Sequence, residues 1–249
     1  MKPKVGLQLW SIQEECREDF SKALKKVKDF GYEGVEFAGY YGLSAKEIKQ
    51  LLTDYDLEVA GSHVQYDDLK NHLEETLDFE EAIGNKRIVV PYVNFDTISA
   101  WQEFIETMQK ISVAVKARGQ ELYYHNHAHE FSAIANEDML DYIARGIPDI
   151  KLEVDLYWLA YAGKDVLTWV ENHKQQVGLF HMKDQQDTPI ESTELGLGIL
   201  PLQSYVEKAQ DLNLPWLIVE QEAFQKRTPI EAVKFDAIIL HQLIKEVYG

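Results

Sequence analysis

The feature that most constrains the fold is a strict alternation of short, β-branched apolar runs with longer amphipathic segments along all 249 residues. The runs predict eight strands, and the segments between them have helical periodicity. Such alternation is typical of a parallel sheet, because parallel strands need crossover connections. Eight units without a long linker predict a single (β/α)8 TIM barrel over residues 1–249. The expected strands span residues 4–9, 34–37, 57–63, 87–93, 121–127, 150–156, 177–183 and 216–222.

Residues at the ends of the amphipathic segments favour the same assignment. Ser44 and Glu47 have the spacing of a helix capping box, and Gly31 and Gly119 stand where helices should end. An open, doubly wound sheet would need a glycine-rich phosphate turn after the first strand, and none follows Gln8. We expect residues 184–198 to be a rim loop without regular structure. The expected helices span residues 19–30, 44–55, 67–83, 97–118, 136–145, 164–172, 201–212 and 229–247.

The charge of the chain restricts its partners. Asp and Glu number 42 against 25 Lys and Arg, for a net charge of −17. Such a surface repels polyanions, so we expect no nucleic-acid partner. Apolar stretches fall short of the roughly 18 residues of a membrane span, and the N-terminal segment lacks the pattern of a secretory signal, so we expect no membrane partner. The single cysteine, Cys16, offers neither an internal disulfide nor a thiolate metal site and fits a reducing, cytoplasmic location.

Polar and ionisable residues recur at the carboxyl end of nearly every expected strand, and in a barrel these ends meet at the rim that carries active sites. Asp155 and Glu220 follow apolar strands, where a carboxylate needs a partner or a cation. His181 ends the strand between them. Neighbouring strands lie about 4.8 Å apart, so we expect the three side chains to share one divalent ion, which is Mn2+, Mg2+, Co2+ or Zn2+. The other side chains placed at this rim are Gln8, Trp10, Glu36, His63, Tyr92, Asn94, His125, Asn126, His127, Lys183, Asp184 and Glu222.

The densest group of histidines lies between His125 and Glu130. Strand alternation places His125 and His127 on one face. Two histidines at this spacing are one way of binding zinc. The interpretation that we favour is that they hydrogen-bond substrate hydroxyls or orient carboxylates. The direction of Glu130 is not set by alternation, because the strand has ended before it.

Seven short segments together carry a family resemblance. They are VGLQLWS (5–11), GVE (34–36), GSH (61–63), YHNHAHEF (124–131), EVDLYW (153–158), FHMKD (180–184) and VEQE (219–222). In this order and spacing the chain resembles the xylose isomerase-like barrel superfamily, the sugar phosphate isomerase/epimerase and endonuclease-IV-like group, over essentially its whole length. In that family one metal ion is typically held by Glu, Asp, His and Glu from four successive strand ends. Asp155, His181 and Glu220 match the last three positions. For the first, the resemblance implies Glu130, with His125, His127 or a water as alternatives.

The resemblance implies a sugar isomerase or epimerase that acts on a small keto-sugar or polyol-derived substrate. Such an enzyme removes a proton next to a carbonyl, through an enediolate that a divalent metal ion stabilises. Glu220 is the first choice of base and Glu130 the second, while His63 and Lys183 are expected to position hydroxyls and move protons. An inosose or keto-sugar dehydratase is the nearest alternative, because the same intermediate can lose a hydroxyl. The residues expected to bind or orient the substrate are Gln8, Trp10, Glu36, His125, Asn126, His127, Trp158 and Glu222.

Other classes fit the sequence less well. A DNA-repair endonuclease shares this fold, but the net charge opposes DNA binding. A non-catalytic sugar-binding barrel would not need the three best-matched metal residues. The loops after the seventh and eighth strands combine Lys183, Lys226 and Arg227 with several carboxylates, which favours a neutral over a phosphorylated carbohydrate. The helices at 97–118 and 229–247 carry enough apolar residues to cover the barrel and also to form a homo-oligomer contact.

Overall fold

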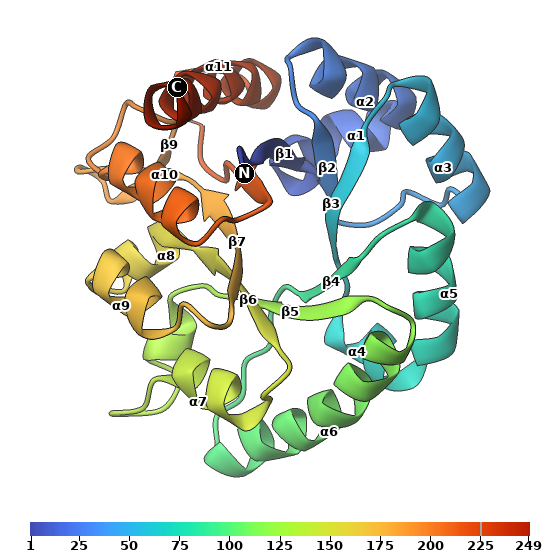
Figure 1. Ribbon diagram of the computed structural model, residues 1–249, viewed down its shortest axis with the longest axis vertical. Coiled ribbons are helices and arrows are strands. Elements are labelled where there is room, and N and C mark those ends of the chain that lie inside the picture. Colours follow the sequence, from blue (N-terminus) through green and yellow to red (C-terminus); the bar gives the residue numbers. More distant parts are fainter. Residues whose placement is uncertain (225) are drawn as a thin grey trace.

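The computed structural model describes residues 1–224 and 226–249 and shows a closed barrel of eight parallel strands (Figure 1). Around the barrel the strand order is β1-β10-β7-β6-β5-β4-β3-β2, so each strand pairs with the next barrel strand along the chain and the last pairs with the first. This confirms the expected (β/α)8 barrel. The barrel strands are β1 (Lys4–Gln8), β2 (Gly34–Phe37), β3 (Glu58–His63), β4 (Arg87–Val90), β5 (Glu121–His125), β6 (Lys151–Asp155), β7 (Val177–Met182) and β10 (Trp216–Val219).

Helices surround the barrel on all sides, as Figure 1 shows. Each buries one apolar stripe; α2, for example, buries Leu24 and Val27 and leaves Lys22 and Lys25 to the solvent side. In the described ranges, no helix combines the length and apolar character needed to cross a membrane. The helices are η1 (Leu9–Ile12), α1 (Gln13–Glu18), α2 (Phe20–Asp29), α3 (Ala45–Asp54), α4 (Tyr66–Asn71), α5 (Leu73–Ile83), α6 (Ile98–Ala117), η2 (His129–Phe131), α7 (Met139–Gly146), α8 (Leu156–Tyr161), α9 (Val166–Asn172), α10 (Leu202–Asp211) and α11 (Pro229–Tyr248).

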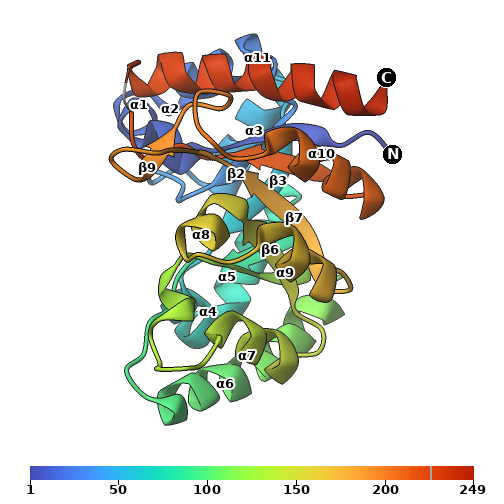
Figure 2. The same cartoon turned by 90° about the vertical axis from the view of Figure 1, so that its left-hand side faces the viewer.

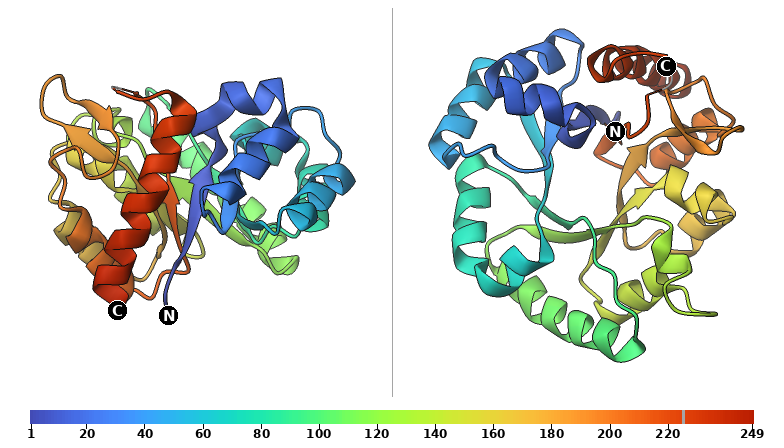
Figure 3. Two further views of the ribbon diagram at one scale, coloured as in Figure 1. Left: turned by 90° about the horizontal axis from the view of Figure 1, so that it is seen from above. Right: turned by 180° about the vertical axis from the view of Figure 1, so that it is seen from behind.

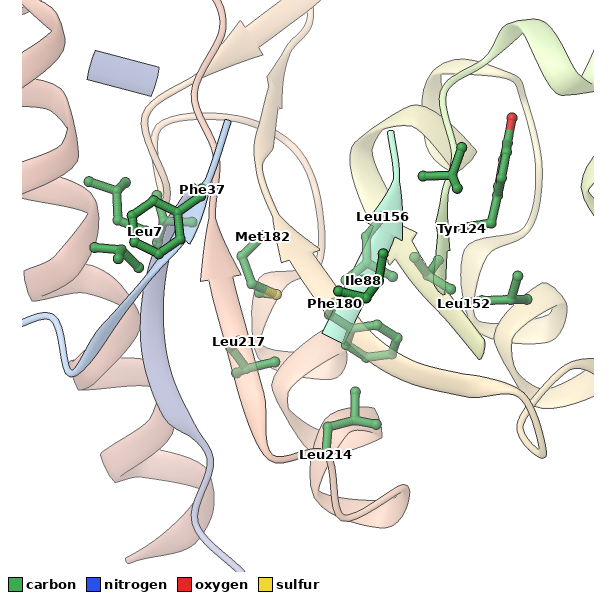
Figure 4. Close-up of a cluster of buried hydrophobic side chains, with 14 of the residues drawn as sticks. Leu7, Phe37, Ile88, Tyr124, Leu152, Leu156, Phe180, Met182, Leu214 and Leu217 are labelled. Carbon is green, nitrogen blue, oxygen red and sulfur yellow. The ribbon is translucent and has the colours of Figure 1, made fainter. Parts of the chain in front are cut away.

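Strand alternation divides the core into two layers. Phe180 and Met182 of β7 belong to the layer between strands and helices, where Figure 4 shows them near Leu217 of β10. Leu179 belongs to the second layer, a small apolar cluster inside the barrel that also contains Trp216. Since alternate residues of a strand point to opposite faces, His181 faces inward like Leu179. The interior is therefore apolar at one end and polar near the carboxyl ends of the strands.

The chain ends lie close together at the end of the barrel where the strands begin, as Figures 2 and 3 show. The amino group of Met1 donates a hydrogen bond of 2.6 Å to the side chain of Asn213, in the turn before β10. The C-terminal helix α11 packs along β1 and β10. The opposite rim is consequently free of chain ends and is formed by the loops that follow the strands.

Three local features differ from the sequence-based expectations. Residues 184–198, expected to lack regular structure, contain a hairpin of β8 (Asp184–Gln186) and β9 (Glu191–Thr193). The buried carboxylate of Asp184 organises this loop, because it accepts hydrogen bonds from the backbone N–H groups of Gln185, Gly196, Gly198 and Leu200. The helix expected at 67–83 is divided into α4 and α5 at His72. A short helix that was not expected, α8, follows β6 directly and is capped by the side chain of Asp155.

Candidate metal centre and substrate cavity

Four potential metal ligands converge at the carboxyl ends of four adjacent strands. His125 ends β5, Asp155 ends β6, His181 lies in β7 and Glu220 follows β10. One ligand atom from each of the four lies within 4.8 Å of every other, and all four side chains are buried. The strand register explains the convergence, since Asp155 is paired with His181 and β5, β6, β7 and β10 are consecutive around the barrel. The structure thus brings together Asp155, His181 and Glu220 and adds His125 as a fourth member.

Lys183 places a buried positive charge among the carboxylates of this group. Its Nζ lies 2.8 Å from Asp155 Oδ2, 2.7 Å from Glu220 Oε2 and 2.9 Å from Glu222 Oε2, and its side chain is fully buried. The ammonium also lies 5.6 Å from the ring centroid of Trp158, within the range of a cation–π contact. Lys183 therefore holds the three carboxylates in a fixed arrangement.

A second layer of buried charge lies deeper in the barrel. Glu36 Oε2 is 2.7 Å from His181 Nε2 and 3.3 Å from His63 Nε2. Glu153 Oε2 is 2.9 Å from His63 Nε2, 3.2 Å from His181 Nε2 and 3.3 Å from His125 Nδ1. There is little free space here, because a Cβ at Gly61 would lie 2.8 Å from Glu36 Oε1. Glu36 and Glu153 are thus positioned to orient the imidazole rings of the layer above.

The charges fix the protonation of the groups nearest Lys183. Burial opposes the charged form of Lys183, but Asp155, Glu220 and Glu222 outweigh it and hold the pKa of the ammonium well above its ordinary value. Burial likewise favours neutral Glu220, but Lys183 and His181 outweigh it and hold the pKa of this carboxyl well below its usual range. For Asp155 the effect of burial is larger than the attraction of Lys183, so the pKa of the Asp155 carboxyl is raised. A buried carboxylate with a raised pKa is one that an additional cation would stabilise.

The two imidazoles of the group differ in charge. Burial is the largest cause that lowers the pKa of His125 well below its ordinary value, and the neighbouring His181 and His127 add to it. His125 is therefore neutral. Neutral imidazole is the form that binds metal ions. Burial also opposes charge on His181, but Glu153 and Glu36 outweigh it and raise the pKa of this ring well above its usual value. A carboxylate on the far nitrogen of a histidine is the usual support of a metal-bound imidazole.

The unpaired atoms of the group fit a divalent metal ion. Asp155 Oδ1 caps α8 by accepting from the backbone N–H of Trp158, whereas the buried Oδ2 accepts no hydrogen bond and has only the ion pair with Lys183. His125 Nδ1 is also buried and, within the described part of the chain, has only the 3.3 Å contact with Glu153 Oε2. Glu220 Oε2 lies 3.1 Å from His181 Nδ1, a spacing suited to two ligands of one ion. Two carboxylates and two imidazoles are a donor set that Mn2+, Co2+ and Zn2+ accept and that Mg2+ accepts less readily.

The structure does not bring Glu130 into this group. Its carboxylate is buried in η2, where Oε1 accepts from the Tyr124 hydroxyl at 2.9 Å and Oε2 from the backbone N–H of His127 at 3.0 Å. A separate cluster of potential ligands unites Glu130 with His127 and His129. Of the fourth-ligand candidates expected from the sequence, His125 lies beside Asp155, His181 and Glu220, and Glu130 does not. The physical reason is that β5 ends at His125 and the following turn directs Glu130 towards Tyr124.

Two residues expected to contact substrate, Gln8 and Asn126, make hydrogen bonds that support the site. The amide of Gln8 donates to Glu36 at 2.7 Å, and its oxygen accepts from the backbone N–H of Trp10. Asn126 is hydrogen-bonded to the backbone of Asp155. Sequence reasoning did not assign a role to Glu153, which contacts three histidines. Strand alternation could have identified Glu153 as a residue of the site, because it lies two residues before Asp155 and therefore on the same inner face.

A cavity of about 820 Å3 opens above the metal-binding group. His125 and Glu220 line its floor together with His63, His127 and Glu222. At its mouth stand the half-exposed rings of Trp10 and Tyr92, which also line it. The ring of Trp158 lies 5.6 Å from that of His127, at the edge of the same region. The arrangement can hold a metal ion and an organic ligand side by side, with carboxylates and imidazoles facing both.

Comparison with known proteins identifies the family. The sequence model of the family described as xylose isomerase-like TIM barrel matches residues 24–238, and the chain belongs to this family. Among curated relatives, an inosose dehydratase from Clostridium perfringens is 23% identical over 200 residues, which cover 70% of this chain and 67% of that protein.

Solved structures have the same fold. A sugar phosphate isomerase/epimerase from Parabacteroides distasonis superposes with a TM-score of 0.85 at 22% identity, over 96% of this chain and 98% of that one. An L-ribulose 3-epimerase superposes with a TM-score of 0.75 at 13% identity, over 99% of this chain and 96% of that one. At these identities the likeness establishes the fold, and the relatives as a group are sugar isomerases, epimerases and dehydratases.

Proposed function

We propose that the protein is a metal-dependent sugar isomerase or epimerase that removes a proton next to a carbonyl of a small keto-sugar or polyol-derived substrate. The observation that carries the proposal is the convergence of His125, Asp155, His181 and Glu220 within 4.8 Å of one another beneath an open cavity. Five carboxyl groups of the site surround three cations, Lys183, His63 and His181, and ionising all five is costly unless a further cation joins them. A binding protein without chemistry would not need this arrangement.

Glu220 is the proposed base. It lines the cavity, and Lys183 keeps it ionised. A divalent ion bound to the group would act as a Lewis acid that stabilises the negative charge left when the proton is removed. Glu220 takes the proton from the carbon next to the carbonyl. Return of that proton to the neighbouring carbon, with the hydroxyl proton moving to the former carbonyl oxygen, gives isomerisation. Delivery of a proton to the opposite face of the same carbon by a second group, for which His63 in the cavity lining is the candidate, gives epimerisation. His63 and His127, which line the cavity, would hold the hydroxyls of the substrate.

The test is proton exchange by purified protein stripped of metal and reloaded with Mn2+, Co2+ or Zn2+. A panel of keto-sugars and inososes is incubated in D2O, and the products are followed by NMR and mass spectrometry. The proposal expects deuterium to enter one carbon of an accepted substrate, only in the metal-loaded protein. Equal exchange by metal-stripped and reloaded protein would falsify the metal-dependent assignment.

Dehydration is the second candidate, favoured by the curated inosose dehydratase relative. The first step is the same removal of a proton by Glu220. The pair of electrons left behind then expels a hydroxyl from the adjacent carbon as hydroxide, which leaves as water after protonation. The two candidates differ in the mass of the product, since only dehydration removes a water. The same experiment therefore decides between them.

A further inference from the structure

The cavity above the metal-binding group is larger than one sugar ring requires. Pockets for drug-sized ligands range over about 300–1,000 Å3, and this cavity of about 820 Å3 lies in the upper part of that range. A monosaccharide has only about a dozen non-hydrogen atoms, well below the size of such a ligand. A sugar bound at Glu220 and His125 therefore leaves much of the cavity unfilled.

The unfilled part lies across the barrel from the metal-binding group. It is lined by Gly39 and Tyr40, which follow β2, and by His72, Thr76 and Phe79 at the start of and within α5; we call this part the α5 arm. In the barrel order, β2 and β3 stand on the opposite side from β6 and β7. Figure 1 shows α5 on the side of the barrel away from β7. The arm is consequently the part of the same cavity that lies away from the metal-binding group.

The wall of the α5 arm is aromatic carbon. The rings of Tyr40 and Phe79 are in contact, with centroids 4.4 Å apart. The hydroxyl of Tyr40 is directed away from the arm to the buried groups Ser62 and Glu80. Asn85 donates a further hydrogen bond to Glu80 at 2.8 Å. Glu80 also lines the cavity, but its two oxygens are paired with Tyr40 and Asn85. The rings of Tyr40 and Phe79 are therefore the surfaces offered to a ligand.

The charges of the arm disfavour an anionic occupant. Asp68 and Glu75 line it, and the cavity lining within residues 1–224 and 226–249 contains neither lysine nor arginine. A phosphate in the arm would face these carboxylates with no lysine or arginine of the described residues beside it. A neutral ring carries no such cost and gains by covering Tyr40 and Phe79.

We propose that the α5 arm is a second subsite for an uncharged aromatic ring joined to the sugar, so that the substrate belongs to the class of aryl glycosides whose sugar ring carries a keto group. This inference rests on the proposed function, because the metal-binding group fixes where the sugar ring lies. Burial of an aromatic ring against the arm is expected to tighten binding by about tenfold or more. The ring is bound as part of the substrate and takes no part in the chemistry.

Isothermal titration of the metal-loaded protein tests the proposal. The probes are matched methyl and 4-nitrophenyl glycosides of glucose, galactose, mannose and xylose, which lack a carbonyl and therefore report binding without reaction, with glucose 6-phosphate as the anionic probe. We expect at least one nitrophenyl glycoside to bind about tenfold more tightly than its methyl partner, and glucose 6-phosphate to bind no better than methyl glucoside. A panel in which every nitrophenyl glycoside binds no more tightly than its methyl partner overturns the subsite.

Variants locate the effect in the arm. Phe79→Ala removes one wall, and Thr76→Trp narrows the arm without hollowing the core; each should reduce the nitrophenyl-to-methyl affinity ratio by about threefold or more. Phe30→Ala is the matched control, since Phe30 is also partly buried but follows α2 and does not line the cavity. An unchanged ratio in both arm variants overturns the assignment to the arm. The two proposals can fail separately. Proton exchange that does not depend on metal contradicts the proposed function and does not change the affinity ratios. Equal affinities for nitrophenyl and methyl glycosides contradict the subsite and do not change the proton exchange.

Discussion

The side chain of Asn126 binds the backbone of Asp155 at two points. Asn126 Oδ1 accepts from the N–H of Asp155 at 3.0 Å, and Asn126 Nδ2 donates to the C=O of Asp155 at 3.3 Å. Both residues are buried, and the pair joins the end of β5 to the end of β6. Asn126 thus positions a proposed metal ligand without contacting the ion.

Asn126→Ala should weaken metal binding although no ligand is changed. Loss of both hydrogen bonds frees the backbone at Asp155, and residues that orient ligands commonly contribute about tenfold or more to metal affinity. Competition with a chromogenic chelator measures the affinity for Zn2+. Circular dichroism of the metal-free variant serves as the control for folding. An affinity equal to that of the wild type would show that Asn126 is not a positioning residue.

His125 and Glu130 give opposite predictions for metal content. His125→Ala removes a proposed ligand and should lower the affinity for Zn2+ or Mn2+ by about a hundredfold or more. Glu130→Gln keeps one acceptor, for the N–H of His127, while its NH2 can donate to the Tyr124 oxygen, and should leave the affinity within about threefold. Both affinities are measured with the same chelator. The reverse pattern would identify Glu130, and not His125, as the fourth ligand.

Glu220→Gln should abolish turnover while the fold is kept. Glutamine matches the size of the side chain but cannot take a proton, so proton exchange is expected to fall by at least about a thousandfold. Asp187→Asn, in the hairpin turn and outside the cavity lining, is a suitable control. Deuterium exchange into substrate by metal-loaded protein provides the measurement. Activity near the wild-type level would remove Glu220 from the mechanism.

Gly34 and Gly6 should respond differently to alanine although they are paired on β2 and β1. A Cβ at Gly34 would lie 2.6 Å from the Trp216 ring and 2.7 Å from the backbone oxygen of Glu58, which cannot move aside. At Gly6 the nearest atom is the Ala60 Cβ, at 3.3 Å. We expect Gly34→Ala to lower the free energy of unfolding by about 2–3 kcal/mol and Gly6→Ala by less than about 1 kcal/mol. Urea unfolding gives both values, and equal losses would contradict the steric account.

Asp236 should make stability depend on pH. Burial raises the pKa of Asp236 in α11 from 3.8 to about 7. The hydrogen bond from the N–H of Leu195 lowers this pKa, and the neighbouring Glu194 raises it further. The folded protein holds this proton more tightly than the unfolded chain. The stabilisation is therefore complete below about pH 4, declines as the pH rises and is lost above about pH 7.

The amide in Asp236→Asn does not titrate in this range. Between pH 5 and pH 8 the free energy of unfolding of the wild type should fall by about 2 kcal/mol more than that of the variant. Urea unfolding at the two pH values measures both changes. Asp67→Asn, an exposed site on α4, is the control and should show no such change. A constant difference between wild type and Asp236→Asn across this range would contradict the raised pKa.

The sequence by itself determined the barrel and the rim where chemistry is expected. Periodicity is a local property, so eight β-branched runs separated by amphipathic segments predict strands and helices without knowledge of distant contacts. Alternation within a strand is equally local, which is why Asp155, His181 and Glu220 were expected on the inner face at adjacent strand ends. Trp216 and Leu179 inside the barrel follow the same rule.

Only the tertiary structure decided how side chains beyond the strand ends are directed. β5 ends at His125, and the turn after it sends Glu130 to Tyr124; neither alternation nor helical period describes such a turn. The position of Lys183 among Asp155, Glu220 and Glu222 depends on three strands meeting in space. The α5 arm exists because the chain bends at His72 between α4 and α5. Strand periodicity is set by neighbours in the chain, whereas loop direction and cavity shape are set by packing between residues far apart in it.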